Sequence, residues 1–507
     1  MRIKILYTIK LIFLCWLCVF ACGCAAVTPD PSPMPIKTPA ATVEPLLSPT
    51  SATIPPQYNE YTVKLDIHPS DNTVTGTEKI KIVNTSGRVL DKVYINVPLN
   101  AFSENASVRP VLDEHIDTVF PDGINYGYME INSVYVCGEE VEFKLDETVL
   151  SVNLPAALPP DEWTELRIEL DAKIPVMNHR TGSGENGMWF GSFLPILAVC
   201  DENGWHTDPY YPIGDPFYAR AANFNVSITT PPEFTVVGPG VPLITDQDDK
   251  KITEFSTKLS RDFAFAISNS YTKSSITTPS NVEISLYTFS DTARKPELLE
   301  LASRSLEYFS NRIGAYPYST LVIAETRLFS KGGIEYSGVI FIDSDYLLAS
   351  ESFSSITHEI GHQWFYNIIG NNQIDFAWMG EGLCSFLQEG FLLNDVELDN
   401  KMAEEYAYLQ SIIPETIPNT LNSSLGDFES WQDYYNIHYL RGKMMFYSLY
   451  KHMGKESFDS FLIEYNRRFS FRIASPKDLA QTAEDVSGME LGTFFEAWIN
   501  EPELPHL

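Results

Sequence analysis

The sequence predicts an α+β protein of several domains, with an all-β, sandwich-like domain followed by a mostly helical domain. From Tyr58 to about residue 270, apolar and polar residues alternate with a period of two, as in the run from Tyr61 to Ile67. From about residue 273 the apolar period becomes three and four, as between Leu298 and Phe309. The change of period divides the folded chain into predicted domains at 57–272 and 273–507.

The composition supports packed domains and excludes one class of partner. The chain has 507 residues, of which 44% are hydrophobic and 13% aromatic, enough for sizeable cores. Its formal net charge is -32, and no basic patch offsets it. A chain this acidic repels nucleic acid, so we expect no nucleic-acid partner.

The first 24 residues have the pattern of a secretory signal. Arg2, Lys4 and Lys10 precede an apolar run, 11–21, that is too short to span a bilayer. VFAC and ACGC, at 19–22 and 21–24, resemble the lipobox of bacterial lipoproteins, so lipid on Cys22 or Cys24 is expected. The Pro/Ser/Thr-rich residues 25–56 then form a linker. This predicts a lipoprotein on the outer face of a bacterial plasma membrane, and cleavage with full secretion is the alternative.

The β-type region consists of short alternating runs that clusters of Asn, Gly, Pro and Asp separate. Many short strands with polar turns are typical of a sandwich of two sheets. Cys137, Cys200 and Cys384 are isolated, which excludes a cysteine metal site. Whether Cys137 and Cys200 form a disulfide stays open.

The second region begins with a strand at 282–287 and a helix with Pro296 near its start and Gly314 after its end. Strands are expected near 320–326 and 338–343, and the remaining long elements should be helical.

His358-Glu-Ile-Gly-His362 is the segment that carries chemistry. Its histidines are four residues apart, which on a helix places them about 40° apart on one face. An apolar row beside them indicates a mostly buried helix that ends at the stop signal Gly370-Asn-Asn: Ile356, Ile360, Trp364 and Ile368. Two imidazoles at this spacing can bind one Zn²⁺.

The acidic residues of this segment take different roles. Glu359 is too close to His358 along the backbone for a third ligand, and its natural role is the general base that takes a proton from water. Glu381, in a second apolar helix, is expected as the third ligand. Two histidines and a glutamate leave the fourth zinc position open, as catalysis requires. The alternatives are a pair of histidines on a solvated helix face, or a structural zinc.

The spacing of HEIGH and Glu381, within WMGEG, resembles the zinc signature of the aminopeptidase N family of gluzincins. Residues 331–336, KGGIEY, resemble that family's GxMEN strand, whose glutamate binds the substrate's α-amine. The resemblance therefore implies that Glu335 binds the amine and that Gly332 and Gly333 belong to the substrate-binding segment.

Residues 439–442, YLRG, resemble the family's Y-x-K-G motif, so Tyr439 is expected to stabilise the oxyanion. Its neighbour His438 should point about 100° away on a helix and is not a ligand. The resemblance extends from about residue 57 to the end and implies a thermolysin-like catalytic domain. One zinc per chain and peptide substrates follow from it.

Several positions depart from the family. Ile334 stands for Met, Tyr336 for Asn, and Arg441 for Lys, while Gly380 replaces the usual Asn or Asp. The segment 187–205 lacks the glutamine motif that often lines the substrate pocket, and the sequence ends without the family's C-terminal helical domain. A more open site is expected. The function predicted is a zinc aminopeptidase. The alternatives are a zinc endopeptidase of the same fold and a catalytically silent peptide-binding surface protein.

Overall fold

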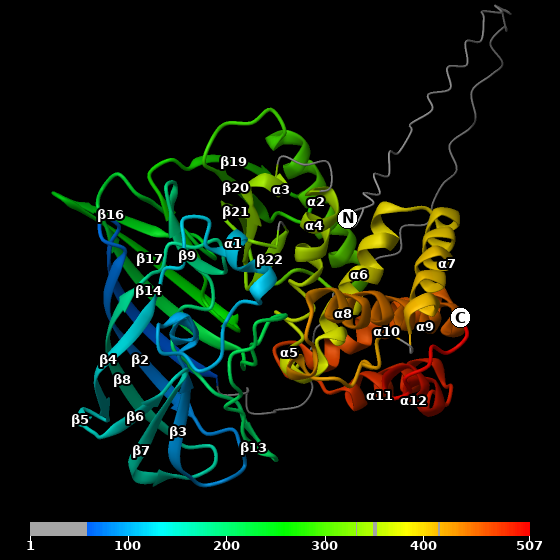
Figure 1. Cartoon of the computed structure of the whole chain (residues 1–507), viewed down its shortest axis with the longest axis horizontal. Helices are drawn as coiled ribbons and strands as arrows, with labels where there is room; N and C mark the ends of the chain where they lie inside the picture. Colours follow the sequence, from blue (N-terminus) through cyan, green and yellow to red (C-terminus); the bar gives the residue numbers. More distant parts are fainter. Residues whose placement is uncertain (1–57, 331, 348–351, 414–415) are drawn as a thin grey trace, which may run out of the picture. The chain divides into compact units, whose positions relative to one another are not determined.

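Strands dominate the N-terminal part of the structure, a computed structural model that describes residues 58–507 except 331, 348–351 and 414–415 (Figure 1). The predicted signal 1–24, with Cys22 and Cys24, and the linker 25–56 lie outside the described residues. Those described belong to one compact unit, so the predicted domains 57–272 and 273–507 pack together and their boundary stays a prediction.

The largest sheet has the strand order β16-β17-β14-β1-β2-β8-β4-β5 within the described residues. All its neighbouring strands pair antiparallel except β1 and β14. Its strands are β1 (Asn59–His68), β2 (Thr73–Val83), β4 (Tyr128–Val136), β5 (Glu139–Glu140), β8 (Trp163–Lys173), β14 (Ala222–Thr230), β16 (Leu243–Gln247) and β17 (Lys250–Ser260).

Two four-stranded sheets share a core with this sheet. One has the order β11-β3-β7-β6, with β3 (Leu90–Asn96), β6 (Phe143–Asp146), β7 (Val149–Leu158) and β11 (Ile196–Leu197). The other has the order β15-β18-β10-β9, with β9 (Thr181–Gly184), β10 (Gly187–Phe190), β15 (Thr235–Val237) and β18 (Phe265–Ser268). The period-two pattern produces this core, because alternate residues such as Tyr61, Val93 and Phe190 point into it.

Short elements connect these sheets. They are η1 (Pro98–Phe102), η2 (Asp113–His115), α1 (Ile116–Val119) and the hairpin of β12 (Cys200–Asp201) and β13 (Gly204–Trp205). Cys137 and Cys200 are free thiols in the structure.

A five-stranded sheet opens the second region, in the order β19-β20-β21-β23-β22. It comprises β19 (Thr272–Thr277), β20 (Glu283–Thr288), β21 (Thr320–Thr326), β22 (Gly333–Tyr336) and β23 (Val339–Asp343). The edge strand β22 runs antiparallel to β23 and contacts helix α4 (Ser352–Gly361). The sheet thereby places the KGGIEY segment beside the HEIGH segment. Lys331, the first residue of KGGIEY, lies outside the described residues.

The rest of the described chain is mostly helical, as the period of three and four predicts. The helices besides α4 are α2 (Lys295–Ile313), α3 (Ser344–Leu347), α5 (Gln373–Phe376), α6 (Trp378–Leu392), α7 (Asp395–Ile412), η3 (Leu425–Asp427), α8 (Trp431–Tyr434), η4 (Tyr435–Arg441), α9 (Gly442–Met453), α10 (Lys455–Phe469), α11 (Pro476–Ser487) and α12 (Gly492–Ile499). None of the described helices combines the length and apolarity needed to cross a bilayer.

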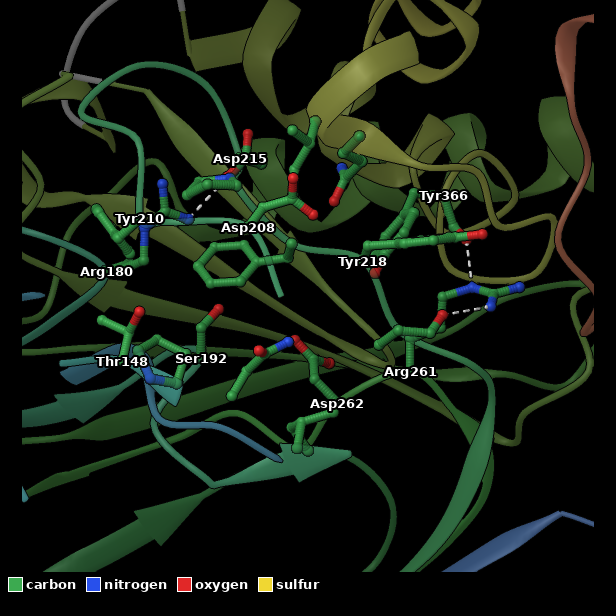
Figure 2. Close-up of a pocket in the computed structure, with 18 of the residues that line it drawn as sticks. Thr148, Arg180, Ser192, Asp208, Tyr210, Asp215, Tyr218, Arg261, Asp262 and Tyr366 are labelled. Carbon is green, nitrogen blue, oxygen red and sulfur yellow. Dashed lines mark hydrogen bonds and ion pairs between the residues drawn. The ribbon is translucent and has the colours of Figure 1, made fainter. Parts of the chain in front are cut away.

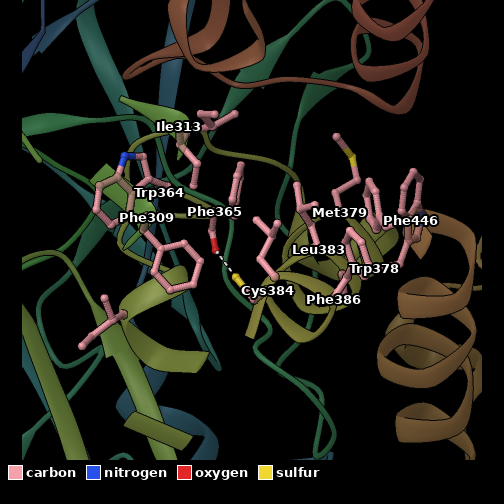
Figure 3. Packing of buried hydrophobic residues seen from close by; sticks show 14 of the residues in the cluster. Phe309, Ile313, Trp364, Phe365, Trp378, Met379, Leu383, Cys384, Phe386 and Phe446 are labelled. Atoms are coloured by element: carbon pink, nitrogen blue, oxygen red, sulfur yellow. Dashed lines mark hydrogen bonds between the residues drawn. The ribbon is translucent and has the colours of Figure 1, made fainter. Parts of the chain in front are cut away.

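The helical core surrounds α4 and α6. Figure 3 shows Phe309 and Trp364 on one side of Cys384, with Trp378 and Phe446 on the other. Trp364, just after α4, and Trp378, at the start of α6, are fully buried, which helps to fix the two segments that carry the predicted ligands. Large buried aromatic rings contribute strongly to such packing because each removes much apolar surface from water. The predicted fold class, a β-rich domain followed by a mostly helical domain, is confirmed.

One helix is shorter than the apolar row predicts. The helix with HEIGH ends at Gly361 and does not continue to Gly370, although Trp364 and Ile368 are buried as expected. After Gly361 the backbone bonds first span three residues, as from Gln363 N to Ile360 O at 3.1 Å, and then five, as from Asn367 N to His362 O at 3.1 Å. The Asn367 side chain also donates to this carbonyl, at 3.0 Å, so a side chain competes with the helical ladder.

Candidate active site

The three predicted zinc ligands meet at the junction of α4 and α6. His358 Nε2 lies 3.0 Å from His362 Nε2, and each nitrogen lies 3.2 Å from Glu381 Oε2. His362 and Glu381 are buried, whereas 12% of the His358 side chain is exposed. Glu381 comes from the first turn of α6, which packs on α4. Helix packing therefore brings together ligands from both ends of the 24-residue span 358–381.

Hydrogen bonds of the two rings make both Nε2 atoms electron-pair donors. His362 Nδ1 lies 2.5 Å from the carbonyl oxygen of Phe365, which can only accept, so this Nδ1 carries the proton. His358 Nδ1 lies 3.1 Å from Gln388 Oε1, and we assign the same tautomer. Two lone pairs and a carboxylate oxygen then face one another, which is unfavourable unless a cation lies between them. Zinc bound tetrahedrally at ordinary bond lengths separates its ligands by about 3.3 Å, so the residues present fit this ion.

The electrostatics of this cluster favour positive charge. Burial opposes ionisation of Glu381, yet the imidazoles of His362 and His358 hold the pKa of that carboxyl well below its usual range. Burial also works against a charged His362, but Cys384, Glu381 and Glu335 raise the pKa of that ring. A site with these partners stabilises a divalent cation.

Glu359 lines an open groove that we call the cleft, bounded by Gly332, Gly333, His358, Glu359, Gln388 and Tyr439 among others. Burial, and then the charge of Glu335, raise the pKa of Glu359 well above its ordinary value. Its carboxyl packs directly on Gly333, where an added Cβ would lie 2.8 Å from Glu359 Oε1. Gly332 meets no such neighbour. A carboxyl with raised pKa beside a metal site is suited to accept a proton from water and return it.

Glu335 belongs to a second acidic group beside the ligands. Carboxylate oxygens of Asp215, Glu335 and Glu381 lie within 4.8 Å of one another. Gln373 Nε2 donates to Glu335 Oε1 at 3.3 Å and helps orient it. Burial, opposed by His362 and assisted by the charges of Asp215 and Glu381, raises the pKa of Glu335 to about 8. Like charges this close favour a bound cation.

Asp215 is a site residue that the sequence did not reveal. It lies in the loop between β13 and β14, and Arg180 Nη1 donates to it at 2.7 Å (Figure 2). Gly214 and Pro216 mark a turn, but no periodic pattern marks Asp215 for function. The structure thus supplies an acid from the β-rich region, where the sequence lacks the glutamine motif. Gln373 and Gln388, which orient Glu335 and His358, also escaped sequence reasoning.

Tyr439 is the tyrosine that faces the ligands. Its ring stacks on His358, with centroids 5.7 Å apart, and the residue lines the cleft. Tyr434 is fully buried and does not line the cleft, while Tyr435 is half-exposed at the cleft wall. Of these three tyrosines, Tyr439 is therefore the one that both lines the cleft and stacks on a predicted zinc ligand.

The helix that carries Tyr439 differs from the regular helix expected. Residues Tyr435–Arg441 form the π-helical segment η4 between α8 and α9. Such segments widen the helix and often occur at functional sites. His438 points into the core against Phe428, is buried, and takes no part in the ligand cluster.

Fold and site together define a class of protein. A β-rich region is joined to a helical domain whose HExxH helix, downstream glutamate and cleft form a metallopeptidase-type centre. Residues 297–498 match the model of the Peptidase family M1 domain.

Related chains agree with this assignment. Aminopeptidase N of Lactococcus lactis subsp. lactis is 23% identical over 236 residues, which cover 41% of this chain and 26% of that protein. The probable aminopeptidase 1 of Sulfurisphaera tokodaii is 24% identical over 223 residues, covering 41% and 28%. The chain therefore spans about a quarter of the length of these curated relatives.

A solved structure shows the same fold over most of the chain. It is a mutant of the M1 zinc metallopeptidase from Deinococcus radiodurans bound to a Tyr-Ser-Ala substrate. It superposes with a TM-score of 0.64 at 16% identity, covering 89% of this chain and 95% of the other.

Proposed function

We propose that this chain is a zinc-dependent aminopeptidase that removes the first residue from peptides, with one zinc per chain. The observation that carries the proposal is the position of the acids Asp215 and Glu335 beside the zinc ligand Glu381, within 4.8 Å. An ammonium bound there places the first peptide bond next to the metal-binding cluster, and the chain beyond it enters the cleft. The curated aminopeptidase relatives support the same reaction.

The residues of the site can be assigned to the steps of peptide hydrolysis. Zinc held by His358, His362 and Glu381 would supply Lewis acidity toward water and the peptide carbonyl. Glu359 accepts the proton of the attacking water and passes it to the leaving amine. Tyr439 donates a hydrogen bond to the carbonyl oxygen as negative charge develops there.

Substrate orientation comes from the acidic pair. Glu335 and Asp215 accept hydrogen bonds from the substrate ammonium, and Gln373 holds the Glu335 carboxylate in place. The Glu359 carboxyl packs against Gly333, and a side chain at position 333 would displace that carboxyl. Charge-assisted hydrogen bonds to a free amine would favour cleavage at the first bond over internal bonds.

Peptide libraries with free and N-acetylated amines test this function. Acetylation removes the ammonium charge, so we expect it to abolish release of the first residue. Equal cleavage of both forms at internal bonds would make the protein an endopeptidase. No cleavage of any peptide by zinc-loaded protein would make it a silent binding protein.

We further propose that the protein is a lipoprotein anchored outside a bacterial plasma membrane. The proposal rests on the signal-like residues 1–24 and the linker 25–56. Mass spectrometry of the mature N-terminus should find lipid on Cys22 or Cys24. An unmodified N-terminus in the culture fluid would make the protein a secreted enzyme.

A further inference from the structure

A second hollow adjoins the cleft at the proposed ammonium site. We call it the inner pocket, and its lining includes Arg180, Asp215, Phe217, Asp262, Glu335 and Tyr366. Arg180, Asp215 and Ile334 line both the inner pocket and the cleft. Because an ammonium at Asp215 and Glu335 would stand at this junction, the side chain of the same residue would enter the inner pocket.

Apolar residues form part of the walls of the inner pocket, and the carboxylate of Asp262 lies apart from the other acids that line it. Ile334, Phe217 and Ile374 are among the apolar residues that line it. Figure 2 shows Asp262 across the pocket from Asp208 and Asp215. Apolar walls beside a buried carboxylate suit a side chain that has an aliphatic stem and a positively charged end.

Asp262 has no cationic partner that neutralises it by a salt bridge among the described residues. Its one hydrogen bond from another residue there is a long one, from the Ser337 amide at 3.4 Å. Burial, with little compensation, raises the pKa of this carboxyl to about 7. A buried acid with few partners leaves hydrogen-bonding capacity for a ligand cation.

The two arginines that line the inner pocket already donate hydrogen bonds to other groups of the protein. Arg180 is paired with Asp215 at 2.7 Å. Arg261, next to Asp262 in the chain, donates to the carbonyl oxygens of Ala219, Tyr366, Ile368 and Arg472 at 2.7–3.0 Å. Both guanidinium groups thus already donate hydrogen bonds within the protein, and the negative charge of Asp262 would repel an acidic substrate side chain.

Asp262 and Glu335 act on a common neighbour. Besides the dominant effect of burial, the charges of both carboxylates raise the pKa of Tyr366, which also lines the inner pocket. Both also raise the pKa of Tyr336. Both acids line the inner pocket, so one substrate residue can engage Glu335 through its amine and Asp262 through its side chain.

We propose that Asp262 selects peptides whose first residue is lysine or arginine. This inference rests on the proposed aminopeptidase function and names its substrate class. The apolar walls take the methylene stem, and the Asp262 carboxylate accepts hydrogen bonds from the terminal ammonium or guanidinium.

Paired substrates test this inference at pH 8 with zinc-loaded protein. The matched pair is the methylcoumarin amides of lysine and norleucine, whose side chains differ mainly in the terminal charge. We expect wild-type kcat/KM to be about tenfold or more higher for lysine, and Asp262→Asn to lower the lysine value by about tenfold to a hundredfold. The norleucine value should stay within about twofold, since Asn keeps the shape of Asp.

Asp375→Asn is the control, because it makes the same charge change outside the inner pocket lining. It should keep the preference for lysine. A wild-type preference for norleucine, or an unchanged lysine-to-norleucine ratio in Asp262→Asn, would overturn the inference while leaving the aminopeptidase function intact. Absence of turnover on every aminoacyl amide would overturn the proposed function and this inference with it.

Inhibition of wild-type enzyme provides a measurement that needs no variant. Free L-lysine should inhibit cleavage of a leucine substrate about tenfold more strongly than L-norleucine, because only lysine engages Asp262. Equal inhibition would contradict the role of Asp262, whatever the stability of the variant.

Discussion

Gly382 of α6 and Gly442 of α9 meet backbone to backbone. A Cβ added to Gly382 would lie 2.7 Å from the carbonyl carbon of Gly442, closer than packed atoms can approach. Gly382 follows the ligand Glu381, and Gly442 stands three residues after Tyr439. This contact explains both motif glycines: it lets the helix with the ligand and the segment with the tyrosine approach closely.

Replacing either glycine with alanine should separate these helices. We expect Gly382→Ala to lower the free energy of unfolding by about 1–3 kcal/mol through overpacking and to reduce kcat more than tenfold. Circular dichroism melting and steady-state kinetics measure the two effects. Gly492→Ala is the matched control, because nothing lies within 4 Å of a Cβ at that helical glycine. Wild-type behaviour of Gly382→Ala would mean that the close contact is unimportant.

Zinc should stabilise the protein as well as activate it. A ligand that binds only the folded state at a thousand times its Kd adds about 4 kcal/mol of stability. We therefore expect chelation to lower the melting temperature and abolish activity, and added zinc to restore both. Elemental analysis should find about one zinc per chain. His358→Gln should lose the metal, whereas His452→Gln, an exposed histidine, should keep it. Full activity of metal-free protein would refute zinc catalysis.

Tyr439→Phe removes one donor and keeps the ring that stacks on His358. We expect kcat to fall by about a hundredfold to a thousandfold with little change in KM, because the hydroxyl acts on charge that develops in the transition state. The melting temperature should barely change. Tyr434→Phe and Tyr435→Phe are the matched controls. A loss of rate in Tyr434→Phe or Tyr435→Phe, with Tyr439→Phe unaffected, would transfer the donor role to that residue.

Glu78 should make stability depend on pH. It is fully buried in β2, and neither carboxyl oxygen has a hydrogen-bond partner among the described residues. Burial raises its pKa well above the model-compound value of 4.5. The folded state therefore keeps a proton that the unfolded chain releases above about pH 4.5, so Glu78 lowers stability as pH rises from there, by about 1.4 kcal/mol per unit.

Glu78→Gln should remove this slope and stabilise the protein at pH 8 relative to wild type. Urea unfolding between pH 5 and pH 8 measures it. Glu254→Gln, an exposed residue of β17, should leave the wild-type slope. If the free energy of unfolding depends on pH equally in wild type and Glu78→Gln, burial of Glu78 does not raise its pKa and the explanation is wrong.

Local periodicity is the part of the fold that the sequence predicts well. Alternation in β1 and the apolar positions of α2, with Pro296 and Gly314 at its ends, correspond to the observed elements. The early end of α4 was not predictable from apolar spacing. Trp364 and Ile368 are buried in the observed turns, and a continued helix would bury them as well. What decides the backbone there is a side-chain hydrogen bond, from Asn367 to the His362 carbonyl.

The candidate site likewise has residues that the sequence predicts and residues that only the structure reveals. His358, His362 and Glu381 follow from spacing, because one short segment holds them all. Asp215 and Asp262 come from distant loops of the β-rich region and reach the site only through tertiary packing. The resemblance to a family points to Glu335 and Tyr439, whereas the π-helical geometry around Tyr439 has no signature in the sequence.

Time-resolved mass spectrometry of one decapeptide with a free amine tests the central claim most directly. The account predicts a ladder that loses one residue at a time from the N-terminus, no ladder from the acetylated peptide, and no ladder with Glu359→Gln, which should still bind zinc. Internal fragments from both free and acetylated peptide would contradict the aminopeptidase assignment, and an intact peptide with zinc-loaded wild type would contradict catalysis altogether.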